Sequence, residues 1–278
     1  MYMFIFIGIA FILLVMRYIQ ISLTNYFTFE PSPIPLNGLE DVNYKFNGNV
    51  ILDSFTGKSG KKIWYLFYCK SKTPSWDDKI TFFCHGNGGN IITNSQYNFT
   101  DKLSETSSVF VFDYRGYGLS PGCPSEHGVY EDTKDAWDFV IKKHPDVNTI
   151  IPIGHSLGSS ILSHLMKEES KNNNKIPPVI ILSAPFYNCK IIAVEMMPYL
   201  GYFNSNLFNT HDYLSSIKKK SPSCKIIYIH SEQDEVIGYH HSKMLQNNIG
   251  GTMFLTSGKH DNPFLNKNIE DLFYLITS

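Results

Sequence analysis

A glycine-x-serine-x-glycine pentapeptide, Gly154-His155-Ser156-Leu157-Gly158, lies between an apolar run and a segment with helical spacing. A serine hydroxyl is a poor nucleophile unless it is held towards a base. A sharp turn from a strand into a helix presents the hydroxyl in this way, and crowding at such a turn requires glycine on both sides. The pattern therefore predicts that Ser156 is a nucleophile. A tight turn whose serine caps the helix is the alternative.

A second glycine-rich turn, His85-Gly86-Asn87-Gly88-Gly89-Asn90, follows the apolar run Thr81–Cys84. A turn of this kind at a strand end exposes backbone N–H groups, which can stabilise an oxyanion during acyl transfer. We expect the N–H groups of Asn87 and Leu157 to form this oxyanion hole. A phosphate cradle is the alternative, but the sequence contains neither GxxxxGK[ST] nor a spaced GxGxxG, so nucleotide binding is poorly supported.

An acid and a base are needed to activate Ser156, and in one known chain order they follow the serine as Asp and then His. The acidic loop after a predicted strand offers Asp234, with Glu232 and Glu235 as rivals. A solvated acidic loop without a catalytic role is the alternative. His260 follows the next predicted strand and is the candidate base.

Other polar clusters are expected to be structural. Asp113-Tyr114-Arg115-Gly116-Tyr117-Gly118 ends a strand, and we expect its charged pair and its glycines to fix a loop, although its acid could be catalytic. Adjacent residues on a helix do not face one ligand, so both His240 and His241 are expected at the surface. Neither HExxH nor CxxC occurs and the five cysteines are scattered, so no metal or cofactor is expected.

The elements that position these residues follow from the hydrophobic pattern. Apolar runs alternate with amphipathic segments, for example around Val129, Ala136 and Val140. Such alternation predicts an α/β fold with a mostly parallel sheet covered by helices on both faces. The predicted strands are Lys62–Cys69, Ile80–His85, Ser108–Asp113, Thr149–Gly154, Val179–Ala184, Lys225–His230 and Thr252–Thr256.

The composition is that of an ordinary globular protein, with 43% apolar and 18% charged residues in 278. The formal net charge is -1, from 24 Lys and Arg against 25 Asp and Glu. No overall basic field is available to bind nucleic acid, so a nucleic-acid partner is not expected. No obligate protein partner is predicted either.

The first 23 residues predict a single-pass membrane anchor. Met1–Met16 carries no charge, and the apolar stretch reaches the required length of about 20 residues if Arg17 snorkels to the interface. A cleaved signal peptide would need a basic start and small residues at its cleavage site, and a core helix would show a polar stripe. Arg17 favours a cytosolic catalytic domain. The glycosylation sequon at Asn98 favours the opposite side, so the topology stays open.

Three further segments complete the predicted organisation. Residues 24–45 contain three prolines and are predicted to form an extended linker, and residues 46–278 are predicted to form the catalytic domain. Within it, residues 188–217 are rich in apolar and aromatic side chains and predict a short helical cap over the pocket. An apolar cap suits an acyl chain, whereas ordinary core packing is the alternative.

The motifs HGNGGN, DYRGYGLS, GHSLGSS, HSEQDEVI and SGKHDNPF occur in the order found in the alpha/beta-hydrolase superfamily. From about Phe46 onward the chain resembles this superfamily. It is most similar to the single-pass membrane members, the alpha/beta-hydrolase domain-containing proteins, and to the related protein depalmitoylases. The resemblance implies that Ser156 is the nucleophile, Asp234 the acid and His260 the base.

The sequence departs from that family in two places. The depalmitoylases carry an N-terminal cysteine cluster, whereas this chain has no cysteine before Cys69. The family's His-Asn-Asp appears as His260-Asp261-Asn262, a swap that is expected to leave the base intact and to alter its surroundings. The combined prediction is a membrane-anchored serine hydrolase of ester or thioester bonds, with lipid or acyl-protein substrates and an acyl-enzyme intermediate. A catalytically silent scaffold and a serine peptidase are the alternatives.

Overall fold

The structure is a computed structural model that describes residues 6–7, 11–12, 14–20, 22, 28–34, 50–70, 76, 79–92, 100, 103–196 and 207–260. The predicted anchor and linker therefore lie partly outside the described residues. Three further features lie wholly outside the described residues: Asn98, the middle of the predicted cap and the two residues after His260. No helix within the described ranges is long and apolar enough to cross a membrane.

An eight-stranded sheet forms the centre of the molecule, with the strand order β10-β9-β8-β7-β4-β6-β3-β2. The pairings from β10 to β6 are parallel, whereas β3 pairs antiparallel with both β6 and β2. All seven predicted strands are present, with ends that differ by at most one residue. The strands are β2 Val50–Thr56, β3 Lys62–Tyr68, β4 Ile80–Cys84, β6 Ser108–Phe112, β7 Ile150–His155, β8 Val179–Ser183, β9 Lys225–Ser231 and β10 Thr252–Thr256.

Two very short strands lie apart from this sheet. Strand β1, Glu30–Pro31, pairs in parallel with β5, Gly88–Gly89. The pairing joins the predicted linker to the glycine-rich turn after β4. Neither β1 nor β5 has the apolar alternation that identifies a strand, and β2 lies half-exposed at the sheet edge, so all three escaped the sequence analysis.

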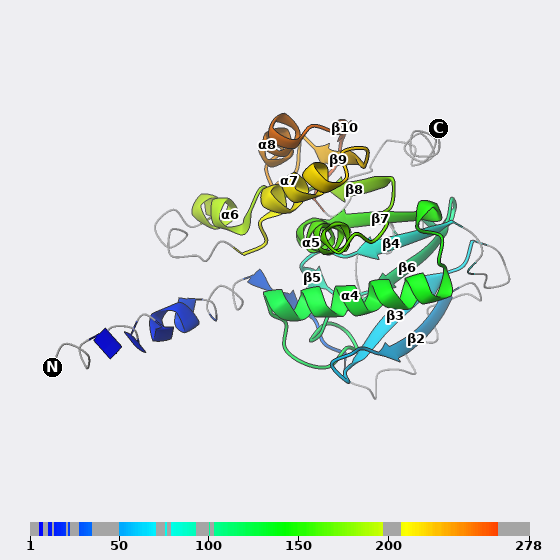
Figure 1. Ribbon diagram of the computed structural model, residues 1–278, viewed down its shortest axis with the longest axis horizontal. Helices are drawn as coiled ribbons and strands as arrows, with labels where there is room; N and C mark the ends of the chain where they lie inside the picture. Colours follow the sequence, from blue (N-terminus) through cyan, green and yellow to red (C-terminus); the bar gives the residue numbers. More distant parts are fainter. Residues whose placement is uncertain are drawn as a thin grey trace.

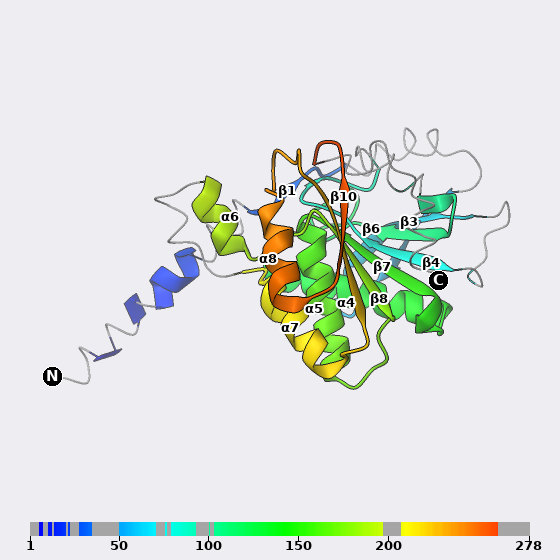
Figure 2. The same cartoon turned by 90° about the horizontal axis from the view of Figure 1, so that it is seen from above.

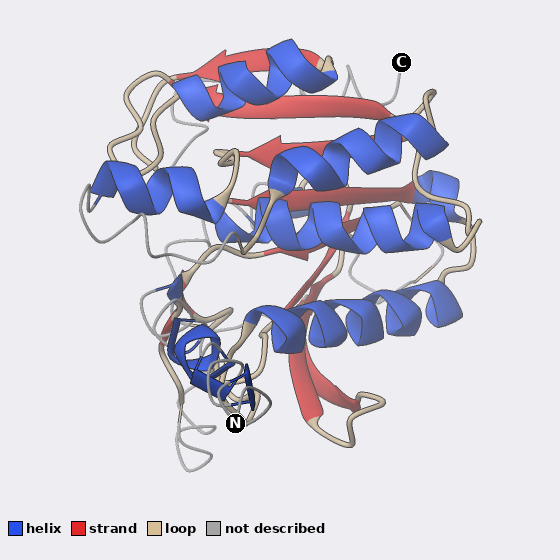
Figure 3. Cartoon of the chain, turned by 60° about the vertical axis from the view of Figure 1, so that its left-hand side comes forward, coloured by secondary structure: helices blue, strands red, loops and turns tan. Residues whose placement is uncertain are grey.

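Among the described residues, helices cover one face of the sheet, as Figure 3 shows. They are α4 Glu126–Lys143, α5 Leu157–Lys171, α7 Thr210–Lys220 and α8 His240–Ile249. The side chain of Ser125 caps α4 by accepting the N–H of Gly128 at 3.1 Å. The described residues confirm the predicted helices on this face of the sheet. For the opposite face, the helices stay a prediction.

The described part of the predicted cap divides between two places in the fold. Helix α7 buries Thr210, Leu214 and Ile217 and lies beside α5, so it belongs to the layer that covers the sheet. Of the described part of residues 188–217, α6, Cys189–Met196, projects from the body of the molecule (Figures 1 and 2). In its described part, the apolar side chains of this stretch therefore serve core packing in α7 and a projecting helix in α6.

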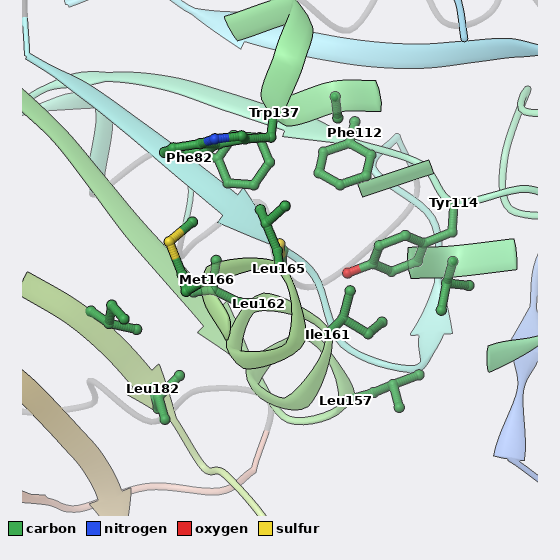
Figure 4. Packing of buried hydrophobic residues seen from close by; sticks show 14 of the residues in the cluster. Phe82, Phe112, Tyr114, Trp137, Leu157, Ile161, Leu162, Leu165, Met166 and Leu182 are labelled. Atoms are coloured by element: carbon green, nitrogen blue, oxygen red, sulfur yellow. The ribbon is translucent and has the colours of Figure 1, made fainter. Parts of the chain in front are cut away.

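Two hydrophobic cores lie on opposite faces of the sheet. Neighbouring residues of β4 divide between them: Phe82 packs in one core and Phe83 in the other, and both side chains are fully buried. Alternate side chains of a strand point to opposite faces, which explains the continuous apolar runs. In the larger core, α5 packs its apolar side against Phe82 and Trp137 (Figure 4). Packing on both sides of the sheet thus holds the strand ends that carry the site.

Candidate active site

Ser156 occupies the turn between β7 and α5 with a backbone φ of 53° and ψ of -119°. A positive φ is strained for a residue other than glycine, and such strain is characteristic of a nucleophile turn. The two flanking glycines are required by close packing. A Cβ on Gly154 would overlap the backbone of Gly158, and a Cβ on Gly158 would overlap the carbonyl oxygens of Cys84 and His85. The N–H of Ser156 donates to Ser183 on β8 at 2.8 Å, which holds the turn in place.

His260 and Asp234 both reach this serine. Nε2 of His260 lies 3.0 Å from Oγ of Ser156, and Nδ1 lies 2.7 Å from Oδ2 of Asp234. The three residues follow parallel strands β7, β9 and β10, whose carboxyl ends meet at one edge of the sheet. The structure therefore brings together the three side chains that the sequence analysis named.

The rival acids lie elsewhere. Glu232 and Glu235 are both exposed, and Glu235 accepts the backbone N–H of His260 at 3.2 Å. The carboxylate of Asp234 is 1% exposed, and its Oδ1 accepts the N–H groups of Val236 and Ile237 at 2.9 and 2.8 Å. These backbone donors fix the orientation of the carboxylate and turn Oδ2 towards the histidine.

Burial pushes the pKa of Asp234 upward, but hydrogen bonds from His230 and His260, the charge of His260 and the N–H of Ile237 outweigh it and hold that pKa well below its usual value. An ionised Asp234 accepts a hydrogen bond from His260, so the ring proton of His260 is on Nδ1. The lone pair of Nε2 then faces the Ser156 hydroxyl, which is the tautomer that a general base needs.

Two histidines that the sequence analysis did not assign also surround the base. His230 at the end of β9 lies 3.4 Å from Oδ2 of Asp234 and donates from Nε2 to the carbonyl of Ile237 at 2.9 Å. The ring of His155 lies 5.0 Å from that of His260. Burial, followed by the charge of His260, lowers the pKa of His155 to about 3, so this ring is neutral. Its place within the pentapeptide was the only signal in the sequence.

The turn that carries Asn87 lies directly against the nucleophile turn, because Gly158 contacts the carbonyl oxygens of Cys84 and His85. Among the described residues, the backbone N–H groups of Asn87 and Leu157 have no hydrogen-bond partner. Leu157 begins α5, where the first N–H groups of a helix are unsatisfied. Within the described residues, both predicted oxyanion donors are therefore unpaired, and they lie in two turns that pack against each other.

The loop after β6 holds this turn in position. Tyr114 donates its hydroxyl to the carbonyl of His85 at 3.0 Å, and Tyr117 donates to Oδ1 of Asn87 at 3.1 Å. The structural role predicted for the loop fits these contacts, but its charged pair does not form. Arg115 bonds to Asp132 of α4 instead of Asp113, because the side chain of Asp113 points into the interior.

Asp113 and His85 form a buried pair in which neither group is charged. Burial raises the pKa of Asp113 to about 8, and burial lowers the pKa of His85 to about 4. Nε2 of His85 lies 3.6 Å from Oδ1 of Asp113, which also accepts the N–H of Ile91 at 2.9 Å. Because both groups are neutral near pH 7, the contact is not an ion pair. The buried His85–Asp113 pair supports the turn that carries Asn87.

One group of described residues, Glu195, His240 and His241, has the spacing to hold a metal ion. The expectation that both histidines lie at the surface is wrong for His241, which is fully buried. Nδ1 of His241 accepts the N–H of Tyr187 at 3.2 Å, so the proton of the neutral ring is on Nε2, which faces Glu195 at 3.0 Å. A protonated nitrogen is a donor and not a metal ligand. The cluster ties α6 to the start of α8.

The sequence and the fold of this chain have counterparts in known proteins. Residues 76–226 match the family model described as Hydrolase_4, serine aminopeptidase S33. The chain belongs to this family of alpha/beta-hydrolases. A crystal structure of an alpha-beta hydrolase from Vibrio vulnificus has the same fold, with a TM-score of 0.69 and 18% identity over 87% of each chain.

Two relatives of this chain differ in how much is known of them. An uncharacterised protein of Acanthamoeba polyphaga mimivirus is 32% identical over 68% of this chain and 69% of its own length. The lysophosphatidylserine lipase ABHD12 of Gallus gallus is 27% identical over 60% of this chain and 46% of its own. The chain thus spans less than half of the length of that lipase. The protein is a hydrolase by family, and its substrate is a matter for proposal.

Proposed function

We propose that the protein is a membrane-anchored serine hydrolase that cleaves ester or thioester bonds, with Ser156 as nucleophile, His260 as base and Asp234 as acid. The observation that carries this proposal is the continuous series of contacts from Asp234 through His260 to Ser156, at 2.7 and 3.0 Å. The low exposure of these three side chains supports the proposal further, because a dry site strengthens each electrostatic interaction.

In the proposed reaction, Nε2 of His260 takes the hydroxyl proton while Oγ of Ser156 attacks the carbonyl carbon. The N–H groups of Asn87 and Leu157 stabilise the negative charge on the carbonyl oxygen. The imidazolium, stabilised by Asp234, then returns its proton to the leaving alcohol or thiol. Water repeats the sequence on the acyl-enzyme, releasing the acid and the free serine.

The proposed substrates carry an apolar acyl group, as in a lysophospholipid or an acylated protein. The lipase relative supports the lipid ester. The proposed anchor is supported by the uncharged stretch Met1–Met16. In its described part Phe6, Phe11 and Leu14 are 78%, 66% and 68% exposed, so these apolar side chains are mostly uncovered by the described protein.

The first experiment is fluorophosphonate labelling of the detergent-solubilised full chain beside Ser156→Ala and His260→Ala. Labelling of the wild type that both variants lose is the expected result. Hydrolysis of lysophosphatidylserine and of p-nitrophenyl esters of graded chain length then defines the acyl preference, while amino-acid p-nitroanilides test for peptidase activity. A folded wild type that takes up no label would instead support a silent scaffold.

The anchor needs a separate measurement. The wild-type protein is expected to stay in the membrane fraction after extraction with alkaline carbonate. A double variant, Phe11→Arg with Leu14→Arg, places two charges in the apolar stretch and is expected to move to the supernatant, because central arginines cost about 2.5 to 3.5 kcal/mol each on insertion. Wild-type protein in the supernatant would contradict the anchor and leave the hydrolase proposal untouched.

A further inference from the structure

The segment Thr28–Ile34, here called the N-terminal strap, is tied to the turn that carries Asn87 by more than the β1–β5 pairing. The N–H of Ser32 donates to the carbonyl of Gly89 at 3.4 Å. The carbonyl of Ser32 accepts the N–H of Gly118 at 3.2 Å and the side-chain amide of Asn90 at 2.8 Å. The strap therefore lies between the oxyanion turn and the loop after β6, and bonds to both.

The strap also contributes a donor to Asn87 itself. Oδ1 of Asn87 accepts the backbone N–H of Glu30 and the hydroxyl of Tyr117, both at 3.1 Å. An amide oxygen has two lone pairs, so these two donors satisfy it and fix the side chain from two directions. Fixing the side chain restricts the backbone of the same residue. That backbone carries the unpaired N–H proposed for the oxyanion hole.

The other end of the strap contacts both ends of the segment that contains α6. The ring of Phe29 is 6% exposed and meets the ring of Phe208 edge-on, at 5.8 Å and 76°. Phe208 has a φ of 50° and donates its N–H to Glu126 at 2.7 Å, so its position is well defined. Oγ1 of Thr28 lies 3.9 Å from Sγ of Cys189, the first residue of α6.

We propose that the N-terminal strap is a positioning element of the active site: Phe29 fixes the strap against Phe208, and the N–H of Glu30 holds Asn87 so that its own N–H meets the developing oxyanion. This inference rests on the proposed hydrolase function. An oxyanion contact is stronger in the transition state than in the bound substrate. Displacing the strap therefore lowers kcat and leaves KM nearly unchanged.

The test uses three variants of the full chain. Phe29→Ala removes the ring that fixes the strap, Glu30→Pro removes the N–H donor, and Tyr117→Phe removes the second donor while its ring is kept. Phe55→Ala is the matched control, because Phe55 stacks on Phe139 at 4.5 Å at the edge of the sheet and loses a comparable aromatic contact. Each protein is assayed for melting temperature, for kcat and KM with p-nitrophenyl butyrate, and for binding of an alkyl boronic acid, which resembles the tetrahedral intermediate.

The three strap and loop variants are expected to lower kcat about tenfold, less than the 100-fold to 1,000-fold typical of a deleted oxyanion donor because the N–H is displaced and not removed. Boronic acid affinity falls in parallel and KM stays within about twofold. The control Phe55→Ala is expected to melt at a lower temperature and to keep the wild-type kcat, KM and boronic acid affinity. If the variants keep wild-type kcat and boronic acid affinity, the strap has no positioning role. Where Phe29→Ala does not fold, Glu30→Pro decides the matter, because it removes the strap's own donor to Asn87. A wild type that fluorophosphonate does not label would overturn the proposed function instead.

Discussion

Replacing Asp234 by asparagine is the substitution whose effect the structure determines most closely. Oδ1 of Asp234 accepts two backbone N–H groups, from Val236 and Ile237, whereas Oδ2 accepts Nδ1 of His260. In Asp234→Asn only the amide oxygen can accept the two backbone protons. The amide nitrogen must therefore occupy the position of Oδ2 and present its protons to His260.

The consequence is a change of tautomer. Facing an amide donor, Nδ1 of His260 becomes an acceptor, and the ring proton moves to Nε2, the atom 3.0 Å from Ser156. A protonated Nε2 cannot accept the serine proton. The same exchange in a serine triad costs about 10,000-fold in kcat. At 1.36 kcal/mol for each factor of ten this is about 5.4 kcal/mol of transition-state stabilisation.

The assay is single-turnover acylation with a p-nitrophenyl ester, measured beside Glu232→Gln and Glu235→Gln. Both controls remove a charge from the same loop, and neither touches the imidazole Nδ1, so we expect them to retain activity within a few-fold. Circular dichroism and thermal melting establish that Asp234→Asn is folded. An Asp234→Asn protein that keeps more than a tenth of the wild-type rate would refute the orientation argument. A large loss of activity in Glu235→Gln would show that Asp234 is the wrong acid.

Three further predictions concern stability. Gly158→Ala should cost more than about 3 kcal/mol of unfolding free energy, because its Cβ meets the carbonyl at the end of β4. The control Gly88→Ala has open space around its Cβ and should cost less than about 1 kcal/mol. Urea titration measures both. Burial raises the pKa of Asp113 from 3.8 to about 8. The protonated carboxyl therefore contributes unfolding free energy at low pH, and this contribution is lost as the pH rises through 8. Asp113→Asn should flatten that decline in urea titrations from pH 5 to 9. Burial lowers the pKa of His155 and of His164 from 6.5 to about 3 and about 4, so unfolding free energy should fall as the pH drops from 6.5 towards 4, and replacing His164 by Gln should reduce the slope.

The sheet was predictable because its strands are buried on both faces. A run such as Val179–Ser183 is apolar up to its last residue, and its ends coincide with turns that glycine, proline or charge identifies. The half-exposed edge strand β2 lacks such a run, and the pairing of β1 with β5 depends on backbone hydrogen bonds of residues far apart in the sequence. Local patterns cannot report a contact between Glu30 and Gly88.

The candidate site divides in the same way. Ser156, Asp234 and His260 follow strands, and parallel strands bring their carboxyl ends together whatever the intervening residues are. His230 and the Glu195–His241 contact were missed because they depend on which face of an element is buried, and two adjacent histidines at a helix start can both reach one carboxylate from another helix. The side of α7 that packs on α5 was likewise assigned to a cap, because an apolar helix face looks the same in either setting.

The separation of the site residues along the chain bears on the protein's synthesis. Ser156 precedes its base by 104 positions, although the two side chains touch in the finished fold. At the 5 to 20 residues per second of translation, roughly 5 to 20 s pass between the two. During that interval the serine lacks the imidazole that the proposed mechanism requires, so the ribosome-bound chain is not expected to cleave the proposed substrates. Activity therefore begins only once the last strand of the sheet has been made.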